Sequence, residues 1–345
     1  MNYLICKDWS NTTNNHAGIK YLCSYLQNQY KGEFKVVVEP AKLKKPSKGF
    51  FKRKLDFLLE WYKSCKHYKN TSRELLDVLK DGDSVFLMEY LDKYIGQYYI
   101  AEKINKNVTG VKVFGMAHLS PLKLKLMFSD AEIVKWVDPL TKVITLGSSL
   151  SSFLEESGVD KNKISTTFHY LDKYYDVETI ESHEEFRVIA MGNQMRDIDT
   201  LAEVTKRCRD MKFYVCQGML ELQEVFTTPN VELIPFVEES ELRNLMKISD
   251  VSLNTMIDTV GSNVIVTSMG MGNAMVCSDV GSIRNYCDES NTFFCSNVDE
   301  FCYSLNKLKE DNALCHKMRS ASYEMSKKYS IDKFYQYLKT ELLTN

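Results

Sequence analysis

The residues best suited to chemistry lie in the run from Asp250 to Tyr286. This run reads as strand, loop, helix, tight turn, strand, glycine turn and helix, and Gly261, Ser262 and Asn263 stand directly before its first helix. Backbone N–H groups at the positive end of a helix bind anions such as phosphate. Ser262 is also a good helix N-cap, and capping alone would account for it. The local sequence leaves both interpretations open.

Motifs for metal binding are weak. Two D-x-D triplets, at 197–199 and 81–83, resemble a metal-binding motif, but neither ends a clearly apolar strand. The ten cysteines include no C-x-x-C pair, which a zinc site would need. The N-terminus has no basic and apolar signal sequence, and no apolar run is long enough to span a membrane. We therefore predict no metal site, free thiols and a cytoplasmic location.

The composition favours a globular protein of two domains. The chain has 345 residues, 44 Lys and Arg against 46 Asp and Glu, and a formal net charge of −2. At about 150 residues per domain, this length predicts about two domains. A general nucleic-acid binder normally carries a strong basic excess. The near-zero balance therefore argues against nucleic acid as a partner.

One segment departs from this balance. Residues 42–69, here called the basic stretch, contain ten Lys and Arg and two acidic residues, a local charge of +8. From Phe51 onward, apolar residues at helical spacing share one face. This composition is typical of an amphipathic helix at an anionic membrane surface. An ordinary helix packed by its apolar face, with its lysines in solvent, fits the same pattern, so both interpretations stay open.

The elements that must position these residues follow an alternating pattern. Short apolar runs alternate with segments of helical period, which is typical of an α/β protein with mostly parallel, doubly wound sheets. The acid-rich segment Asp172–Glu185 lacks periodicity and is the best candidate for a linker. Ligands of such sheets bind at the carboxyl ends of the strands. The expected strands are 3–6, 34–38, 84–88, 111–114, 143–146, 164–168, 188–191, 212–216, 231–235, 251–254 and 274–278.

The run that begins at Asp250 resembles the C-terminal domain of GT-B glycosyltransferases, in particular the large retaining group with a Glu-x7-Glu motif. In that group it typically reads EGxxNvxLEAMAxGxPVVasDvGG. Here SMGMG at 268–272 matches AMAxG, MVCSDVG at 275–281 matches PVVasDvG, and Asn263 falls on the motif asparagine. The resemblance is specific over this run and looser in the first half of the chain.

The resemblance implies a fold and domain boundaries. It predicts two Rossmann-like domains that face each other across a cleft, with a C-terminal helix that crosses back to the first domain. The implied ranges are 1–172 for the acceptor-side domain, 173–186 for the linker, 187–328 for the donor-binding domain and 329–345 for the returning helix.

The resemblance also implies site residues on both domains. On the donor side these are Gly192, Gly218, Phe236, Val237, Gly261, Ser262, Asn263, Thr267 and, for the phosphates, Arg196. On the acceptor side, His118 would face the cleft, and His16 and Gly18 would belong to a glycine-rich loop. A packed loop histidine remains an alternative for His118, and a helix cap for His16. We predict that His67, His183 and His316 lie on the surface, because their surroundings are charged.

The sequence departs from the family pattern at its two glutamates. They fall on Thr259 and Thr267, so the spacing is kept and both carboxylates are lost. A threonine hydroxyl can hydrogen-bond a sugar or ribose, but without the added strength of a charge-assisted bond. Asp258, one residue away, is a candidate to replace the first acid. Asn193 stands where the family has a phosphate-binding arginine, which leaves Arg196 as the nearest cation.

The function that the resemblance implies is glycosyl transfer. The donor would be a UDP- or GDP-linked sugar, and the acceptor a glycan or a lipid-linked molecule, in bacterial surface polysaccharide synthesis. Transfer would proceed with retention, without metal or cofactor, and with His118, Asp258 and Thr259 as the catalytic candidates. The basic stretch would hold the protein to the inner face of the plasma membrane. The alternative is a catalytically inactive GT-B protein that serves as a binding or scaffolding subunit.

Overall fold

The computed structural model describes residues 1–9, 15–41, 66–94, 96–177, 179–181, 183–218 and 220–343. The chain divides into two compact units. The first unit comprises residues 1–167 together with 335–345, and the second comprises 168–334. The segment that the sequence analysis assigns to a linker, 173–186, thus lies within the second unit. Most of the basic stretch, residues 42–65, falls outside the described residues.

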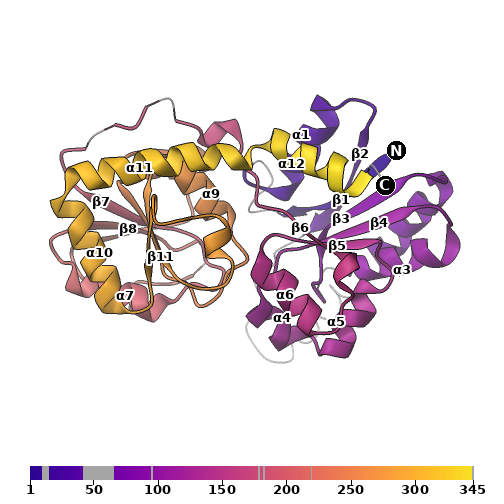
Figure 1. Ribbon diagram of the computed structural model, residues 1–345, viewed down its shortest axis with the longest axis horizontal. Helices are drawn as coiled ribbons and strands as arrows, with labels where there is room; N and C mark the ends of the chain where they lie inside the picture. The colour runs from indigo at the N-terminus through magenta and orange to yellow at the C-terminus, as the bar shows by residue number, and fades with distance from the viewer. Residues whose placement is uncertain are drawn as a thin grey trace. The chain divides into compact units, whose positions relative to one another are not determined.

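The first unit is built on a six-stranded sheet in which all paired strands are parallel (Figure 1). Its strand order is β2-β1-β3-β4-β5-β6. All seven residues of β3 are buried, as expected for a central strand covered on both faces. The strands are β1 (Asn2–Trp9), β2 (Phe34–Ala41), β3 (Ser84–Tyr90), β4 (Lys112–Ala117), β5 (Lys142–Thr145) and β6 (Ile164–Thr166).

Helices connect successive strands of this sheet. Ser129 and Glu132 form a capping box that begins α5, and Ser120 caps α4 ahead of a proline in its first turn. Residues 66–78 are also helical. The bounds are α1 (Ile19–Gln29), α3 (Gln97–Asn107), α4 (Pro121–Met127), α5 (Asp130–Val137), α6 (Ser148–Glu156) and the 3-10 turn η1 (Lys161–Lys163).

The second unit repeats this architecture. Its six parallel strands have the order β12-β11-β10-β7-β8-β9. Every residue of β10 and of β11 is buried, so these two strands form the centre of the unit. The strands are β7 (Arg187–Ala190), β8 (Lys212–Cys216), β9 (Val231–Ile234), β10 (Val251–Asn254), β11 (Ala274–Ser278) and β12 (Thr292–Cys295).

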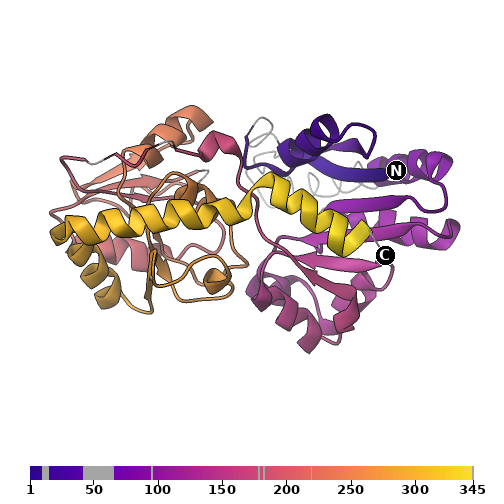
Figure 2. The same cartoon turned by 45° about the horizontal axis from the view of Figure 1, so that its top comes forward.

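Helices of the second unit pack in pairs, α10 beside α7 and α11 beside α9. Leu201 and Val204 of α7 and Phe301 and Leu305 of α10 share one apolar core with the sheet. Figure 2 shows α11 crossing in front of the strands of this unit. The bounds are α7 (Ile198–Arg207), α8 (Glu239–Lys247), α9 (Asn263–Gly270), α10 (Val298–Glu310), α11 (Asn312–Ser326), α12 (Ile331–Tyr337), the 3-10 turns η2 (Lys173–Tyr175), η3 (Ile283–Asn285) and η4 (Lys327–Tyr329), and the π-helical η5 (Leu338–Leu343).

The C-terminal residues belong to the first unit. The Tyr335 ring stacks on Tyr30 with 3.5 Å between ring centroids, and its hydroxyl lies 2.9 Å from both carboxylate oxygens of Glu33. Tyr337 donates a hydrogen bond of 2.7 Å to the Ser165 hydroxyl. The prediction of an α/β protein with two doubly wound, Rossmann-like domains is confirmed. Among the strands of the described residues, only β12 has no counterpart among the predicted ones.

Candidate functional site

The donor-side residues named by the sequence analysis gather at one edge of the second sheet. Each follows a strand directly: Gly192 follows β7, Gly218 follows β8, Phe236 follows β9, and the segment 255–262 follows β10. Because the strands are parallel and adjacent, their carboxyl ends meet at the same edge. This edge is where doubly wound sheets bind ligands.

Backbone hydrogen bonds join the loop after β7 to the loop after β10. Ile257 donates its N–H to the Met195 carbonyl at 2.8 Å, and Asp197 donates its N–H to the Thr255 carbonyl at 3.0 Å. Arg196, between these two contacts, forms an antiparallel bridge with Met256. Met195 has a φ of +53°, which is uncommon for a residue other than glycine. The two loops therefore form one platform at the edge of the sheet.

Arg196 is the cation of this platform. Its Nη1 donates a hydrogen bond of 2.9 Å to the Cys216 carbonyl at the end of β8. Its Nη2 is buried and has no hydrogen-bond partner among the described residues. Burial lowers the pKa of Arg196 to about 10, so the guanidinium still carries its charge at neutral pH. A buried cationic N–H without an acceptor is costly, and an anion would satisfy it.

The glycines of the site permit close approach between segments. Gly192 has a φ of +78°, and a Cβ there would lie 3.1 Å from Cγ2 of Val264 in the first turn of α9. A Cβ on Gly218 would lie 2.1 Å from Nδ2 of Asn193. That Asn193 amide donates to the Gln217 carbonyl at 3.2 Å. The loop after β7 is thus packed between the start of α9 and the turn after β8.

Ser262 caps α9, because its Oγ accepts a hydrogen bond of 3.3 Å from the Ile265 N–H. The prediction that amides of this turn are available to an anion needs one correction. The N–H of Gly261 donates to the Thr259 hydroxyl at 3.0 Å and is therefore engaged. The amides of Ser262 and Val264, in contrast, donate no hydrogen bond to any part of the chain that the structure describes.

The two threonines at the motif positions have different environments. The Thr267 hydroxyl donates to the Asn263 carbonyl at 2.7 Å, within its own helix. Thr259 is buried, its hydroxyl accepts from Gly261, and its carbonyl accepts from the Ser282 N–H at 2.8 Å. Asp258 is half-buried and accepts the Thr259 N–H at 2.8 Å.

Phe236 and Val237 lie between β9 and α8. Phe236 is 61% exposed, which is unusual for a large aromatic side chain. Val237 is half-buried. An exposed ring at the carboxyl edge of a doubly wound sheet is a surface on which a planar group could stack.

The acceptor-side residues of the first unit lie at the carboxyl edge of its own sheet. His118 follows β4, and its Nε2 lies 2.7 Å from the Met88 carbonyl. Burial lowers the pKa of His118, so its imidazole is neutral at pH 7. The His16 ring lies 4.6 Å from the Tyr21 ring at a tilt of 50°, and Gly18 stands at the N-cap of α1.

The sequence analysis missed a buried ionisable cluster in the first unit, formed by Lys7, Glu39 and Glu89 near the ends of β1, β2 and β3. Lys7 Nζ lies 3.8 Å from Glu39 Oε2 and donates to the Tyr68 hydroxyl at 3.0 Å. Glu89 accepts the Lys7 backbone N–H at 3.3 Å. Burial raises the pKa of Glu89 to about 7, and it lowers the pKa of Lys7. The sequence did hold a signal for this cluster, because each of the three charged residues stands within or beside an apolar strand run.

The prediction that His183 lies on the surface is wrong. Its side chain is only 8% exposed, and its Nδ1 lies 2.9 Å from Asp250 Oδ1. The same carboxylate oxygen accepts from Arg319 Nη1 at 3.0 Å. Arg319 also donates to the Glu181 carbonyl at 2.8 Å, so the segment before β7 is held against α11. The acidic neighbours of His183 in the sequence suggested that it faces solvent. In the fold it is buried against Asp250, the residue directly before β10.

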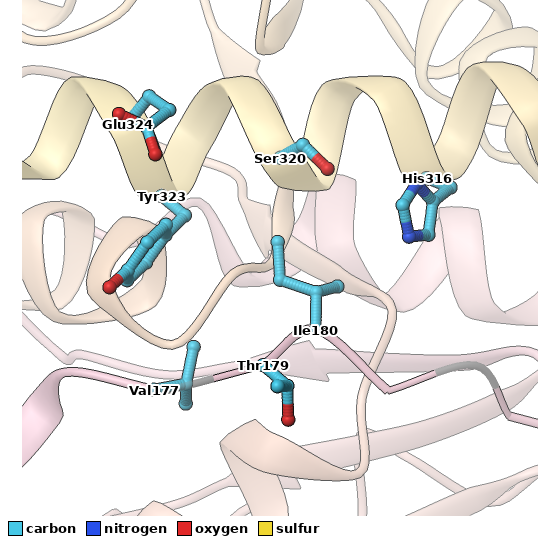
Figure 3. Close-up of a pocket in the computed structure, with 7 residues that line it drawn as sticks. All are labelled: Val177, Thr179, Ile180, His316, Ser320, Tyr323 and Glu324. Carbon is cyan, nitrogen blue, oxygen red and sulfur yellow. The ribbon is translucent and has the colours of Figure 1, made fainter.

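A shallow pocket of about 390 Å³ is lined by side chains of α11 and of the chain before β7. Figure 3 shows the side chains from α11 opposite those of Val177, Thr179 and Ile180. Among the residues that the structure describes, no three His, Cys, Asp or Glu side chains converge in a way that could hold a metal ion. None of the helices in the described ranges is long and apolar enough to cross a membrane.

Comparison with known proteins extends these observations. Residues 186–311 match the model of a family described as glycosyl transferases group 1. This match lies within the second unit and confirms the prediction of a glycosyltransferase at the level of the enzyme class. No curated protein sequence matches the chain significantly.

Solved structures show that the whole chain has the GT-B fold. The structure of Anabaena Alr3699/HepE in complex with UDP aligns with a TM-score of 0.72 at 12% identity, and the alignment covers 100% of both chains. The lipopolysaccharide outer core galactosyltransferase WaaB aligns with a TM-score of 0.67 at 14% identity, over 99% of this chain and 100% of that chain. The N-terminal domain of Candida albicans trehalose-6-phosphate phosphatase aligns with a TM-score of 0.72 at 10% identity, over 99% and 96%. At such identities the likeness defines the fold alone.

Proposed function

We propose that the protein transfers a sugar from a nucleoside diphosphate sugar to a hydroxyl of a glycan or of a lipid-linked acceptor. The observation that carries this proposal is the buried Nη2 of Arg196, which has no partner among the described residues. A diphosphate held between Arg196 and the amides of Ser262 and Val264 would supply the missing acceptor. It would also lie at the positive end of α9, where the helix dipole favours negative charge.

The remaining donor-side residues receive roles from their positions. The exposed ring of Phe236, with Val237 beside it, would stack on the base. The Thr267 oxygen, whose proton points into its own helix, would accept a hydrogen bond from the ribose. Asp258 and Thr259 would face the sugar. Gly192 and Gly218 would shape the donor-side loops, because a Cβ at either position would lie against Val264 or Asn193.

The reaction that fits these groups is metal-independent transfer with retention. The bond between the anomeric carbon and the diphosphate oxygen breaks, and a bond from the acceptor oxygen forms on the same face of the sugar. The acceptor proton passes to an oxygen of the leaving diphosphate, and no other base is required. Arg196 and the α9 amides would stabilise the negative charge that develops on the diphosphate. His118, neutral and on the first unit, would contact the sugar or the acceptor.

The nucleotide and the setting are further parts of the proposal. The HepE structures contain UDP, glucose or UDP-glucose, which favours UDP over GDP for this chain as well. WaaB acts on lipopolysaccharide, and this supports a role in bacterial surface polysaccharide synthesis. The basic stretch would then hold a cytoplasmic protein to the anionic inner face of the plasma membrane, near a lipid-linked acceptor.

Release of nucleoside diphosphate from UDP- and GDP-sugars tests the proposal. In the absence of an acceptor, wild-type protein should slowly hydrolyse one of the UDP- or GDP-sugars. Arg196→Ala should reduce this rate by about 100-fold, because it removes a charge aimed at the leaving group. Arg207→Ala is the matched control, since Arg207 lies at the exposed end of α7 and pairs with Asp299. An unchanged rate in Arg196→Ala would contradict the assigned site.

The second candidate is a catalytically inactive GT-B protein that binds partners in a glycosylation complex. The observation that favours it is the loss of both motif carboxylates, together with the Thr267 proton being committed to the helix backbone. Tight donor binding without turnover for any acceptor would support this alternative. Slow donor hydrolysis that depends on Arg196 would exclude it.

A further inference from the structure

Tyr286, which the sequence analysis names only as the end of a motif, lies directly against the turn that precedes α9. Gly261 in this turn has a φ of +87°. A Cβ at Gly261 would lie 2.1 Å from Cε2 and 2.4 Å from Cζ of the Tyr286 ring. The ring therefore fills the space where any other residue at position 261 would have its side chain. Gly261 is required both by its backbone angle and by this contact.

The turn is held from two sides. From one side, the Thr259 hydroxyl accepts the Gly261 N–H at 3.0 Å. From the other side, the Tyr286 ring packs against Gly261 and leaves its backbone no room to shift in that direction. The residues that follow are Ser262, the N-cap of α9, and the first turn of the helix. A displacement of Gly261 would thus redirect the amides of Ser262 and Val264.

Tyr286 is itself fixed by its surroundings. Its side chain is only 2% exposed, and its hydroxyl accepts the His169 N–H at 2.9 Å. The hydroxyl of Tyr329 donates to the Tyr286 carbonyl at 3.2 Å, and the two rings lie 5.3 Å apart. Burial raises the pKa of Tyr286, so the phenol stays protonated at neutral pH. The ring is a rigid support rather than a mobile side chain.

We infer that Tyr286 is a positioning residue for the anion-binding turn and that it aims the Ser262 and Val264 amides at a diphosphate. The inference rests on the proposed function, since it assigns the part of the donor that these amides bind. The contact that matters is the ring edge against Gly261. The hydroxyl oxygen lies 2.7 Å from the same Cβ position, and its bond to the His169 N–H secures the ring.

The test measures how much tighter the protein binds a nucleoside diphosphate than the monophosphate. Titration calorimetry with UDP and UMP, and with GDP and GMP, gives the ratio of the two dissociation constants for each base. Tyr286→Leu removes the ring edge, and we expect this ratio to fall at least fivefold while UMP or GMP binding changes little. Tyr286→Phe keeps the ring, and the ratio should stay within twofold of wild type. A merely structural role would not separate the two nucleotides.

Phe301→Leu is the matched control. Phe301 is as buried as Tyr286, lies in the same unit and packs on the α7 side of the sheet. In Phe301→Leu, the ratio of the monophosphate and diphosphate dissociation constants should remain that of wild type. The inference is overturned if folded Tyr286→Leu keeps the wild-type ratio, or if Phe301→Leu lowers it equally. Should Tyr286→Leu fail to fold, a fivefold fall of the ratio in Tyr286→Phe overturns the assignment to the ring. Wild-type protein that binds neither diphosphate contradicts the proposed function instead.

Discussion

Thr259 and Thr267 stand at the two positions where the family motif has glutamates, but their hydroxyls differ in what they stabilise. Thr267 Oγ1 donates to the Asn263 carbonyl within α9. A threonine that bonds back to its own helix adds little stability. Thr259 Oγ1 instead accepts the N–H of Gly261, and both residues are buried. Removing that acceptor leaves an unsatisfied donor in the protein interior.

Replacing each threonine by valine should therefore give unequal results. Thr259→Val should lower the free energy of unfolding by about 1–3 kcal/mol, because a buried N–H loses its acceptor. Thr267→Val should change it by less than about 0.5 kcal/mol, because the main-chain bonds of α9 are kept. Urea unfolding followed by far-UV circular dichroism measures both. Equal losses would show that the Thr259 hydroxyl does not hold the turn.

The strand ends of the first unit carry a different kind of interaction. Glu89 at the end of β3 is 7% exposed, and Lys7 and Glu39 on the neighbouring strands are similarly buried. Glu39 Oε2 is 3.8 Å from Lys7 Nζ, and burial raises the pKa of Glu39 as well. Two carboxylates beside one ammonium cannot all be charged cheaply in a buried site. A proton on Glu89 relieves this, which agrees with its pKa of about 7.

The stability of the first unit should consequently fall as pH rises from about 4.5 to 7. In this window the folded protein keeps a proton on Glu89 that the unfolded chain has released, since the pKa rises from 4.5 to about 7 on folding. The loss amounts to at most about 3 kcal/mol. Glu89→Gln cannot ionise and should remove this part of the pH dependence. Urea unfolding at pH 5 and pH 8 measures it.

The control for this prediction is Glu155→Gln, at an exposed position in α6. It should retain the wild-type difference in stability between pH 5 and pH 8. If Glu89→Gln retains that difference too, Glu89 does not hold a proton in the folded protein at pH 5 that it loses by pH 8.

The elements of the fold could be predicted from the sequence far better than the contacts of the site. Continuous apolar runs such as those of β10 and β11 are specific to buried parallel strands. β12, an edge strand whose two middle residues are only half-buried, was not predicted. Gly192 and Gly218 come just after predicted strands, so their place at the carboxyl edge follows from local sequence. Burial of His183 by Asp250, and of Gly261 by Tyr286, depends on tertiary partners that no local pattern reveals.

The two units differ in how the chain builds them. The second unit is one continuous segment, 168–334, whereas the first needs residues 335–345 in addition to 1–167. Tyr335 is one anchor of this added segment. It is 5% exposed, stacks on Tyr30 and bonds to Glu33 next to β2. Loss of this anchor should therefore affect the first unit and leave the second unchanged.

Tyr335→Ala tests this asymmetry. Truncation of a buried aromatic side chain costs about 3–5 kcal/mol, and here it also removes the hydrogen bonds to Glu33. Amide hydrogen exchange read by mass spectrometry should show faster exchange in β1, β2 and β3, with β7 to β11 unchanged, because opening of the first unit does not require opening of the second. Tyr303→Ala is the control, since Tyr303 lies on α10 and is 64% exposed, and it should alter exchange in neither sheet. Faster exchange in both sheets of Tyr335→Ala would mean that the units unfold as one cooperative body, so that the C-terminal segment stabilises the whole chain rather than the first unit.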